Sequence, residues 1–273
     1  MSQAHSYLIN GSSNLAISPF DRGFAYGDGV FRTLKIIDGQ PQHWPQHYQK
    51  LVADCAAISI VCPSAELLMN DIVQLFKLDE IAVAKIIITR GEGERGYAPP
   101  AVTMPMRVVI KSAMPQYAEE NYTNGVELYL CETRLNAQTK LAGIKHLNRL
   151  ENVLARMEWQ SEAIFDGLML DGQANAIECT MSNIFAKFEN TLITPDLSEC
   201  GVAGITRQQI ISHATPLDVQ IKVAPLPFAQ LLKAEEVIVC NSLYGAFQVN
   251  KIDSQTWKSG NLAKKIRELL AHD

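Results

Sequence analysis

The sequence predicts a mixed α/β fold of the α+β class, divided into two domains. Short stretches rich in Val, Ile and Leu, bounded by turn residues, recur along the chain and are typical of strands. Between them lie segments whose apolar residues repeat every three to four positions, which is typical of amphipathic helices. A polar stretch at 114–125 separates two sets of such segments, and 273 residues are enough for two hydrophobic cores.

The first set of segments, within residues 1–113, predicts a smaller N-terminal α/β domain. Apolar stretches predict strands at 6–10, 30–37, 84–89 and 106–111. Helical periodicity predicts helices at 46–58 and 65–76. Together these elements indicate a mixed sheet covered by helices.

The second set, within residues 126–273, follows the 114–125 linker and predicts a larger C-terminal domain. Strands are predicted at 126–131, 167–170, 183–188, 191–194, 237–240 and 246–250. Helices are predicted at 148–162, from about Gly204 onward, and at 262–271. The last helix is amphipathic, so we expect it to pack on the surface.

Composition and charge limit the classes of function. A formal net charge of -5, a pI near 5.7 and the lack of a basic run argue against nucleic acid as a partner. No stretch reaches the roughly 18 apolar residues of a membrane span, and the N-terminus lacks the basic start of a secretion signal. We therefore expect a cytoplasmic protein without a membrane partner.

The six cysteines are dispersed, without a Cys-x-x-Cys pair or histidines at metal-ligand spacing. We expect no bound metal and free thiols that are buried as small apolar side chains. Cys179 follows an acidic residue, and for it too a packing role is favoured over nucleophilic catalysis.

Lys145 is the strongest candidate for a catalytic residue. It lies between an apolar, strand-like stretch and the helix predicted at 148–162. A lysine amine with its ordinary pKa of about 10.4 is a poor nucleophile, so a catalytic lysine needs burial, a nearby cation or a carbonyl partner. His146 and Arg149 stand close in sequence. A solvated surface charge is the usual role of a lysine and is the alternative.

Residues 91–96 match the G-x-G-x-x-G pattern of dinucleotide-binding loops and follow an apolar strand. That pattern needs a helix to begin at its last glycine, and the two prolines that follow here disfavour one. Two glutamates inside the motif would also repel phosphate. We therefore interpret the segment as a loop that presents Arg90, Arg95 and Tyr97 to a small anion, with a plain surface turn as the alternative.

Two segments offer groups that bind phosphate. The stretch 201–207 leads into a helical pattern, so backbone N–H groups near Ile205 and Thr206 are available to an anion, and the Thr206 hydroxyl adds a donor. Asn241 and Ser242 follow a predicted strand and form a second polar cluster. An ordinary capped helix and an ordinary turn are the alternatives.

Glu178 lies among apolar and small polar residues in the segment 175–185. The usual interpretation of such a residue is a surface glutamate. The alternative is a carboxylate held ionised to bind a protonated ring nitrogen, which pyridoxal phosphate requires to act as an electron sink.

These features, in their order along the chain, resemble those of the fold-type IV pyridoxal-phosphate enzymes. The resemblance extends from Leu8 to about Val249 and includes the segment 21–31, DRGFAYGDGVF. The family contains branched-chain and D-amino-acid aminotransferases and the aminodeoxychorismate lyases. It implies the two-domain fold-type IV fold, pyridoxal 5'-phosphate as cofactor and a homodimer.

By this resemblance, Lys145 is the Schiff-base lysine and Glu178 pairs with the pyridine nitrogen. The cofactor phosphate is expected to contact Ile205, Thr206, Asn241, Ser242 and Lys50. Family members usually have an arginine in a His-x-x-Arg-Leu motif, whereas this chain reads HYQKL, with Lys50 in that place. Lysine keeps the charge but lacks the bidentate fork of arginine, which implies weaker cofactor binding.

Within the family, the segments 141–151 and 89–97 are most similar to those of aminodeoxychorismate lyases. D-amino-acid aminotransferases typically have a tyrosine in place of Phe31 and a histidine in place of Tyr97. The resemblance implies 4-amino-4-deoxychorismate as substrate, and pyruvate and the folate precursor 4-aminobenzoate as products. Substrate contacts are expected from Phe31, Arg32, Arg95 and Tyr97. The alternatives are a D-amino-acid or branched-chain aminotransferase, and a catalytically silent protein that binds a metabolite.

Overall fold

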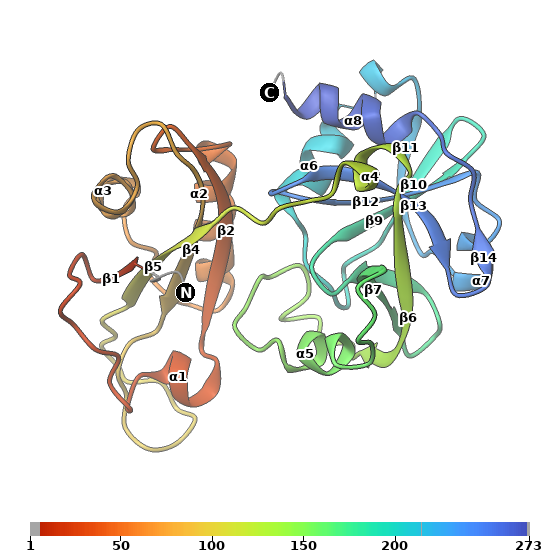
Figure 1. Cartoon of the computed structure of the whole chain (residues 1–273). Coiled ribbons are helices and arrows are strands. Elements are labelled where there is room, and N and C mark those ends of the chain that lie inside the picture. Colours follow the sequence, from red (N-terminus) through yellow and green to blue (C-terminus); the bar gives the residue numbers. More distant parts are fainter. Residues whose placement is uncertain (1–5, 214, 272–273) are drawn as a thin grey trace. The chain divides into compact units, whose positions relative to one another are not determined.

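The chain folds into two compact units (Figure 1), and the computed structural model describes residues 6–213 and 215–271. The first unit is formed by Met1–Pro115 and Ile144–Asn148. The second is formed by Gln116–Gly143 and Arg149–Asp273. The chain therefore leaves the second unit for five residues, and these five include Lys145.

Sequence reasoning treats 114–125 as a linker and keeps 144–148 in the C-terminal domain. In the structure the stretch after Pro115 belongs to the second unit, where Tyr117 and Tyr122 pack against the core. The 144–148 segment belongs to the first unit because its backbone bonds to that unit's sheet. Hydrogen bonds between backbone groups far apart in sequence leave no periodic signal, so this excursion has no signature in the sequence.

The sheet of the first unit has the order β1-β5-β4-β2-β3, with antiparallel neighbours throughout. Its strands are β1 (Ser6–Ile9), β2 (Gly29–Ile37), β3 (Gln40–Pro41), β4 (Ile81–Thr89) and β5 (Met106–Ala113). Its helices are α1 (Arg22–Tyr26), α2 (Trp44–Ala57) and α3 (Ala65–Leu75).

The core of the first unit lies between one face of this sheet and the helices α2 and α3. Alternate residues of β2 enter it, and Val30, Leu34 and Ile36 are fully buried. Leu51 of α2 and Leu68 of α3 pack in the same cluster. Each such side chain contributes about 1.5–3 kcal/mol when fully buried, so the period-two pattern specifies which face of β2 meets the helices.

The sheet of the second unit has the order β11-β10-β9-β12-β13-β6-β7-β8, and β14 pairs with β13. Its strands are β6 (Val126–Leu135), β7 (Ile164–Asp171), β8 (Ala176–Cys179), β9 (Asn183–Phe188), β10 (Thr191–Pro195), β11 (Gln220–Ala224), β12 (Glu236–Asn241), β13 (Gly245–Ile252) and β14 (Gln255–Thr256). The helices are α4 (Glu119–Thr123), α5 (Leu150–Arg156), α6 (Ile205–Ser212), α7 (Phe228–Leu231) and α8 (Leu262–Leu270), with a 3₁₀ turn at Thr215–Leu217.

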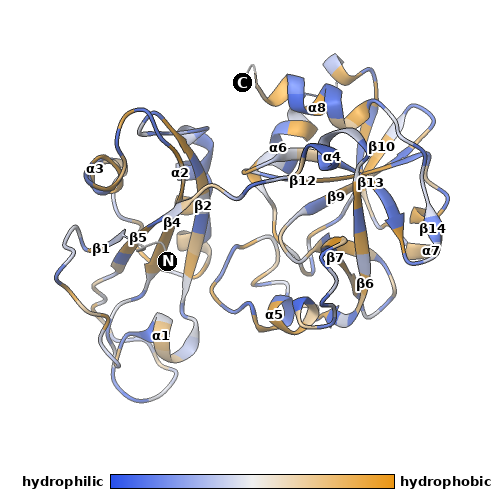
Figure 2. Cartoon of the chain, viewed as in Figure 1, coloured by the Kyte–Doolittle hydropathy of each residue, from blue (hydrophilic) through white to orange (hydrophobic). Residues whose placement is uncertain are grey.

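The central strands of this sheet are buried on both faces. Along β9, Ile184 belongs to one core cluster and its neighbour Phe185 to another. The second cluster also includes Ile210 of α6 and Ile266 of α8. Strands covered on both sides are apolar at successive positions, and Figure 2 accordingly shows hydrophobic residues along the strands of each unit.

Each strand and helix predicted from the sequence is present, with ends shifted by a few residues, but the helix predicted at 148–162 is wrong in length. Helix α5 ends at Arg156. Beyond it, Trp159 is buried beneath Gly167 and stacks on Tyr129, which draws the chain out of the helical path. Strand β8 and several other short elements, among them α1, α4, α7 and β11, were not predicted.

The six cysteines are free thiols, as predicted, and five of them are buried, whereas Cys62 is half-buried. Residues 1–5, on which the expectation of no leader depends, lie outside the described residues. In the described part of the chain, no helix combines the length and the apolar character needed to cross a membrane.

His47 of α2 is buried, and among the described residues its Nδ1 atom has no hydrogen-bond partner. Burial, together with the positive charges of Arg32, His43 and Lys145, lowers the pKa of His47 to about 3. The folded chain therefore keeps this ring neutral at pH values where the unfolded chain, with an ordinary histidine pKa of about 6.5, takes up a proton.

We predict that this difference makes the fold less stable as the pH falls below about 6.5, because the unfolded state then binds more protons than the folded state. Between pH 8 and pH 5 the contribution of His47 is a loss of about 2 kcal/mol. Urea unfolding of the wild type and of His47→Gln at both pH values measures it. Equal pH dependence in the two proteins would contradict the prediction.

Candidate functional site

Lys145 is held by backbone hydrogen bonds within the first unit. Its carbonyl oxygen accepts from the Phe31 N–H at 2.9 Å, and its own N–H donates to Asp54 Oδ2 at 3.3 Å. The adjacent His146 pairs with Val30 at the end of β2. The Lys145 ammonium lies 4.8 Å from the centre of the Phe31 ring, in cation–π contact. The structure thus brings together two of the predicted site residues, Lys145 and Phe31.

Asp54 is a buried carboxylate at the centre of a charged cluster. It forms ion pairs with Arg32 of β2 and with Lys50, one turn earlier on α2. Burial and the Arg32 guanidinium lower the pKa of Lys50 to about 8. Lys50 was predicted to bind phosphate and Arg32 to bind substrate. Both form ion pairs with Asp54, the same carboxylate that accepts the Lys145 N–H.

Lys85 was not predicted, yet its ammonium also lies 4.8 Å from the centre of the Phe31 ring. It occupies β4 opposite Thr33, on the same face of the sheet as Phe31. Among the described residues, none forms a hydrogen bond or ion pair with the Lys85 ammonium. Strand alternation carries the signal that was missed, because 31, 33 and 85 share one face once β2 and β4 are paired.

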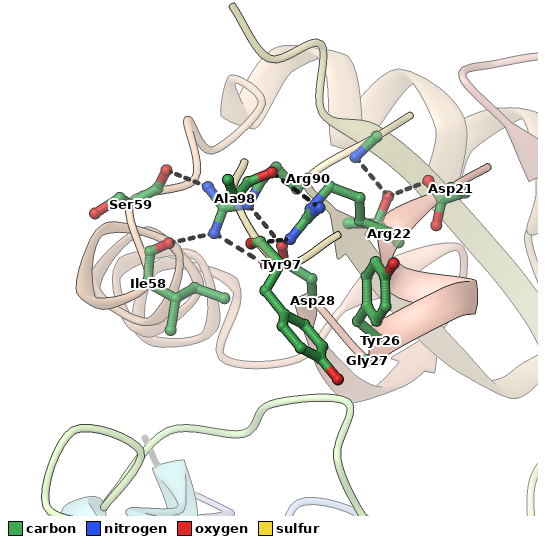
Figure 3. A network of polar contacts seen from close by, with 12 residues as sticks. Asp21, Arg22, Tyr26, Gly27, Asp28, Ile58, Ser59, Arg90, Tyr97 and Ala98 are labelled. Carbon is green, nitrogen blue, oxygen red and sulfur yellow. Dashed lines mark hydrogen bonds and ion pairs between the residues drawn. The ribbon is translucent and has the colours of Figure 1, made fainter. Parts of the chain in front are cut away.

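The glycine-containing segment 91–98 is an irregular loop after β4, and no helix begins in it. This confirms that the dinucleotide pattern is fortuitous. Arg95 is exposed, and Tyr97 is 86% exposed with its ring 5.5 Å from that of Tyr26. In Figure 3 the backbone of Tyr97 lies beside the side chains of Arg22 and Arg90. Two of the four predicted substrate ligands, Arg95 and Tyr97, therefore occupy a surface loop of the first unit.

Glu178 lies on β8 in the second unit and is only 3% exposed. Its Oε2 atom accepts the backbone N–H of Val202 at 2.7 Å. Arg149 lies near Glu178. Burial lowers the pKa of Arg149, and the negative charge of Glu178 partly opposes this lowering. Glu178 thus combines burial with a backbone N–H donor and a nearby cation, and its role toward a cofactor stays a prediction.

The loop that leads into α6 is held by hydrogen bonds to Asn183 and to Gly143. Asn183, at the start of β9, donates to the Val202 carbonyl at 2.8 Å and accepts the Gly204 N–H at 3.2 Å. Gly143 bonds to the backbone on either side of Val202, donating to Gly201 and accepting from Ala203. A Cβ atom at Gly204 would lie 2.3 Å from the Asn183 amide oxygen, so a larger residue there would displace the Asn183 side chain. Sequence reasoning missed Asn183, whose partners lie some twenty positions away.

Helix α6 begins at Ile205 with Gly204 as its N-cap, which has no side chain to cap the first turn. The N–H groups of Ile205 and Thr206 are in this turn, and the hydroxyls of Thr206 and Ser242 lie 3.4 Å apart. Asn241 instead shapes the turn after β12, because its Oδ1 accepts the N–H groups of Leu243 and Tyr244. The N-terminus of a helix with two hydroxyls beside it matches the chemistry of a phosphate group.

The chain matches the amino-transferase class IV family over residues 29–252. It belongs to this family. A curated aminodeoxychorismate lyase from Vibrio harveyi is 36% identical over 268 residues, covering 96% of this chain and 98% of the relative. The crystal structure of 4-amino-4-deoxychorismate lyase from Pseudomonas aeruginosa superposes with a TM-score of 0.92 at 39% identity, covering 98% of each chain.

The chain is also similar, more distantly, to the structure of a hypothetical aminotransferase from Mycobacterium tuberculosis in its PLP-bound form. Its TM-score is 0.80 at 18% identity, over 97% of each chain, and at that identity it shows the fold alone. Together these comparisons confirm the fold-type IV prediction and the resemblance from which it came.

Proposed function

We propose that the chain is a pyridoxal-phosphate-dependent lyase that converts 4-amino-4-deoxychorismate to 4-aminobenzoate and pyruvate. The observation that carries the proposal is the likeness to two aminodeoxychorismate lyases, at 36% and 39% identity, over nearly the full length of every chain compared. The aminotransferase alternative has less support: a putative branched-chain-amino-acid aminotransferase from Methanocaldococcus jannaschii is 26% identical over 92% of this chain.

The residues present fit the cofactor. The N-terminus of α6, with the Thr206 and Ser242 hydroxyls, offers donors to the phosphate. Glu178 offers a buried carboxylate to a protonated ring nitrogen. Lys145 offers the primary amine that reacts with the aldehyde, and Lys50 supplies the positive charge that an arginine gives in relatives.

Pyridoxal phosphate, when bound, supplies an electron sink for negative charge on the carbon that carries the substrate's amino group. Glu178, a buried carboxylate that accepts the Val202 N–H, would bind the protonated ring nitrogen and keep the proton there. The Lys145 amine takes the proton from C4 of the substrate. The bond from C3 to the enolpyruvyl oxygen then breaks, the oxygen takes a proton and pyruvate leaves, while the ring becomes aromatic.

The substrate carries two carboxylates, and the first unit offers cations for them. Lys85 lies over the same aromatic ring as Lys145 and forms no ion pair with a described residue. We propose Lys85 as a carboxylate ligand, in addition to Arg95 and Tyr97 from the 91–98 loop. The Phe31 ring would then separate the binding cation from the catalytic one.

We also propose that the chain acts as a homodimer. Helix α5 exposes Leu150, Val153, Leu154 and Met157, which follow the i, i+3, i+4, i+7 spacing of one helix face. Apolar stripes of this kind are usually covered by a partner. Light scattering on the purified protein tests the proposal, and a mass of one chain at micromolar concentration would contradict it.

The cytoplasmic location and the absence of nucleic-acid or membrane partners remain proposals. Their support is the net charge of -5, which disfavours binding to anionic surfaces, and the free thiols, which suit a reducing compartment. Cell fractionation tests the location.

The lyase proposal is tested with freshly generated 4-amino-4-deoxychorismate, measuring 4-aminobenzoate and pyruvate together. We expect equal amounts of both products. D-alanine with 2-oxoglutarate is run in parallel. Glutamate formed there, without 4-aminobenzoate in the first reaction, would identify an aminotransferase instead.

In the same assay we predict that Lys145→Ala lowers kcat by about 10²–10⁴-fold, the usual value of a positioned acid–base group. Lys140→Ala removes an exposed lysine from the same stretch and should leave kcat unchanged. Undiminished turnover by Lys145→Ala would exclude the catalytic role.

For Lys85→Met we predict that KM rises about tenfold or more, as expected for the loss of one charged hydrogen bond to the substrate. The matched control is Lys35→Met, since Lys35 lies further along the same face of β2 without a cation–π contact to Phe31. Equal KM values for the two variants would remove Lys85 from the substrate site.

A further inference from the structure

Arg22 is a charged residue that is only 4% exposed, and a single loop receives most of its hydrogen bonds. Its guanidinium donates to the carbonyl oxygens of Gly96 at 3.0 Å, Tyr97 at 2.9 Å and Ala98 at 3.4 Å. A buried charge is costly unless its donors are satisfied. The loop therefore has a specific conformation that satisfies Arg22, and Figure 3 shows the carbonyl groups of Tyr97 and Ala98 directed at it.

The rest of the Arg22 side chain is also enclosed. A Cβ atom at Gly93 would lie 2.8 Å from Arg22 Cδ, so the loop backbone packs directly on the arginine stem. The guanidinium carbon lies 5.0 Å from the centre of the Tyr26 ring, which in turn is 5.5 Å from the Tyr97 ring. The loop thus wraps around Arg22 from residue 93 to residue 98.

Asp28 joins this arginine to the start of the same loop. Its carboxylate accepts from Arg22 Nε at 2.9 Å, and from Arg90 at 2.7 and 2.9 Å. Burial acts to raise the pKa of Asp28, but the hydrogen bonds from Arg90 and Arg22 outweigh it and hold the pKa below its ordinary value. Arg90 also donates to the carbonyls of Ile58 and Ser59 after α2. Both ends of the loop are therefore tied to one carboxylate.

The segment that carries Arg22 and Asp28 also holds the lysine. Gly27 accepts from the Asn148 side chain at 3.1 Å, and Gly29 accepts the Leu147 N–H at 2.9 Å. Phe31 donates its N–H to the Lys145 carbonyl. Residues 21–31 are thus a common support for the 93–98 loop on one side and for the lysine on the other, all within the first unit.

We propose that Arg22 is a positioning residue, which holds the 93–98 loop on the 21–31 segment in the conformation that presents Arg95 and Tyr97 to the substrate. Arg22 itself touches neither substrate nor reacting atoms. Its loss weakens substrate binding and leaves the chemistry at Lys145 in place. This inference rests on the proposed lyase function only for its kinetic consequence, because the clamp on the loop is independent of the reaction.

The kinetic test compares Arg22→Gln with Arg22→Lys and with a matched control, Arg107→Gln. Arg107 also pairs with a buried aspartate of the first unit, Asp71, but has no contact with the 93–98 loop. We expect KM for 4-amino-4-deoxychorismate to rise about tenfold or more in Arg22→Gln with kcat within about threefold of the wild type. Lysine keeps the charge without the fork, so Arg22→Lys should fall between the two.

Trypsin gives a second readout that needs no activity. The bond after Arg95 lies inside the clamped loop, and proteolysis tracks how often a segment opens locally. We expect cleavage after Arg95, identified by the mass of the fragments, to become about tenfold faster in Arg22→Gln and to be unchanged in Arg107→Gln. If Arg22→Gln does not fold, the same two measurements on Arg22→Lys decide the question.

A rise in KM together with faster cleavage after Arg95 supports the proposal. An unchanged KM, unchanged cleavage, a loss confined to kcat, or equal effects in Arg107→Gln would each overturn it. If the wild type forms no 4-aminobenzoate, the lyase proposal fails, and the trypsin measurement still decides whether Arg22 clamps the loop.

Discussion

The hydrogen bonds that return residues 144–148 to the first unit are the constraint on which the rest of the site depends. Without them Lys145 would be one more lysine on a connection between a strand and a helix. With them its backbone is attached to Phe31 and Asp54, and its ammonium lies over an aromatic ring. Gly143, two residues earlier, bonds to Gly201 and Ala203. Gly143 thus helps to hold the same loop of the second unit that Glu178 and Asn183 hold.

The charged groups around this segment are better explained by positioning than by stability. Removing ions from water costs several kcal/mol per ion, so the buried pair of Arg32 and Asp54 adds little net stability. The same carboxylate, however, accepts the Lys145 N–H and pairs with Lys50. Glu178 acts similarly in the second unit, since it accepts one specific N–H in the loop before α6. In both units a buried acid determines where a functional backbone segment lies.

The sequence was sufficient to predict the main strands and helices and the functional groups that are marked by a pattern of neighbouring residues. Apolar periodicity indicated the longer strands and helices, and the glycine before α6 indicated a helix N-terminus. Lys85, Asn183 and Arg22 were missed, because each acts on a partner distant in sequence or across a sheet. Of these three, only Lys85 could have been predicted, because the alternation of side chains along β4 places it on the same face of the sheet as Phe31. The early end of α5 follows from the burial of Trp159 against Gly167, a tertiary contact that overrides helical propensity.

Lys50 contributes to the charge balance around Asp54. With Arg32 and Lys50 both protonated, the cluster carries one positive charge in excess of its single carboxylate. This excess positive charge would attract an anionic group of a ligand. Because burial and Arg32 lower the pKa of Lys50 to about 8, the excess is lost as the pH rises through that value, whereas an arginine would keep it. A lysine at position 50 thus makes the positive charge of the cluster depend on pH within the physiological range. Asp54 pairs with Lys50 and accepts the Lys145 N–H, so the change in charge occurs beside the group that holds Lys145.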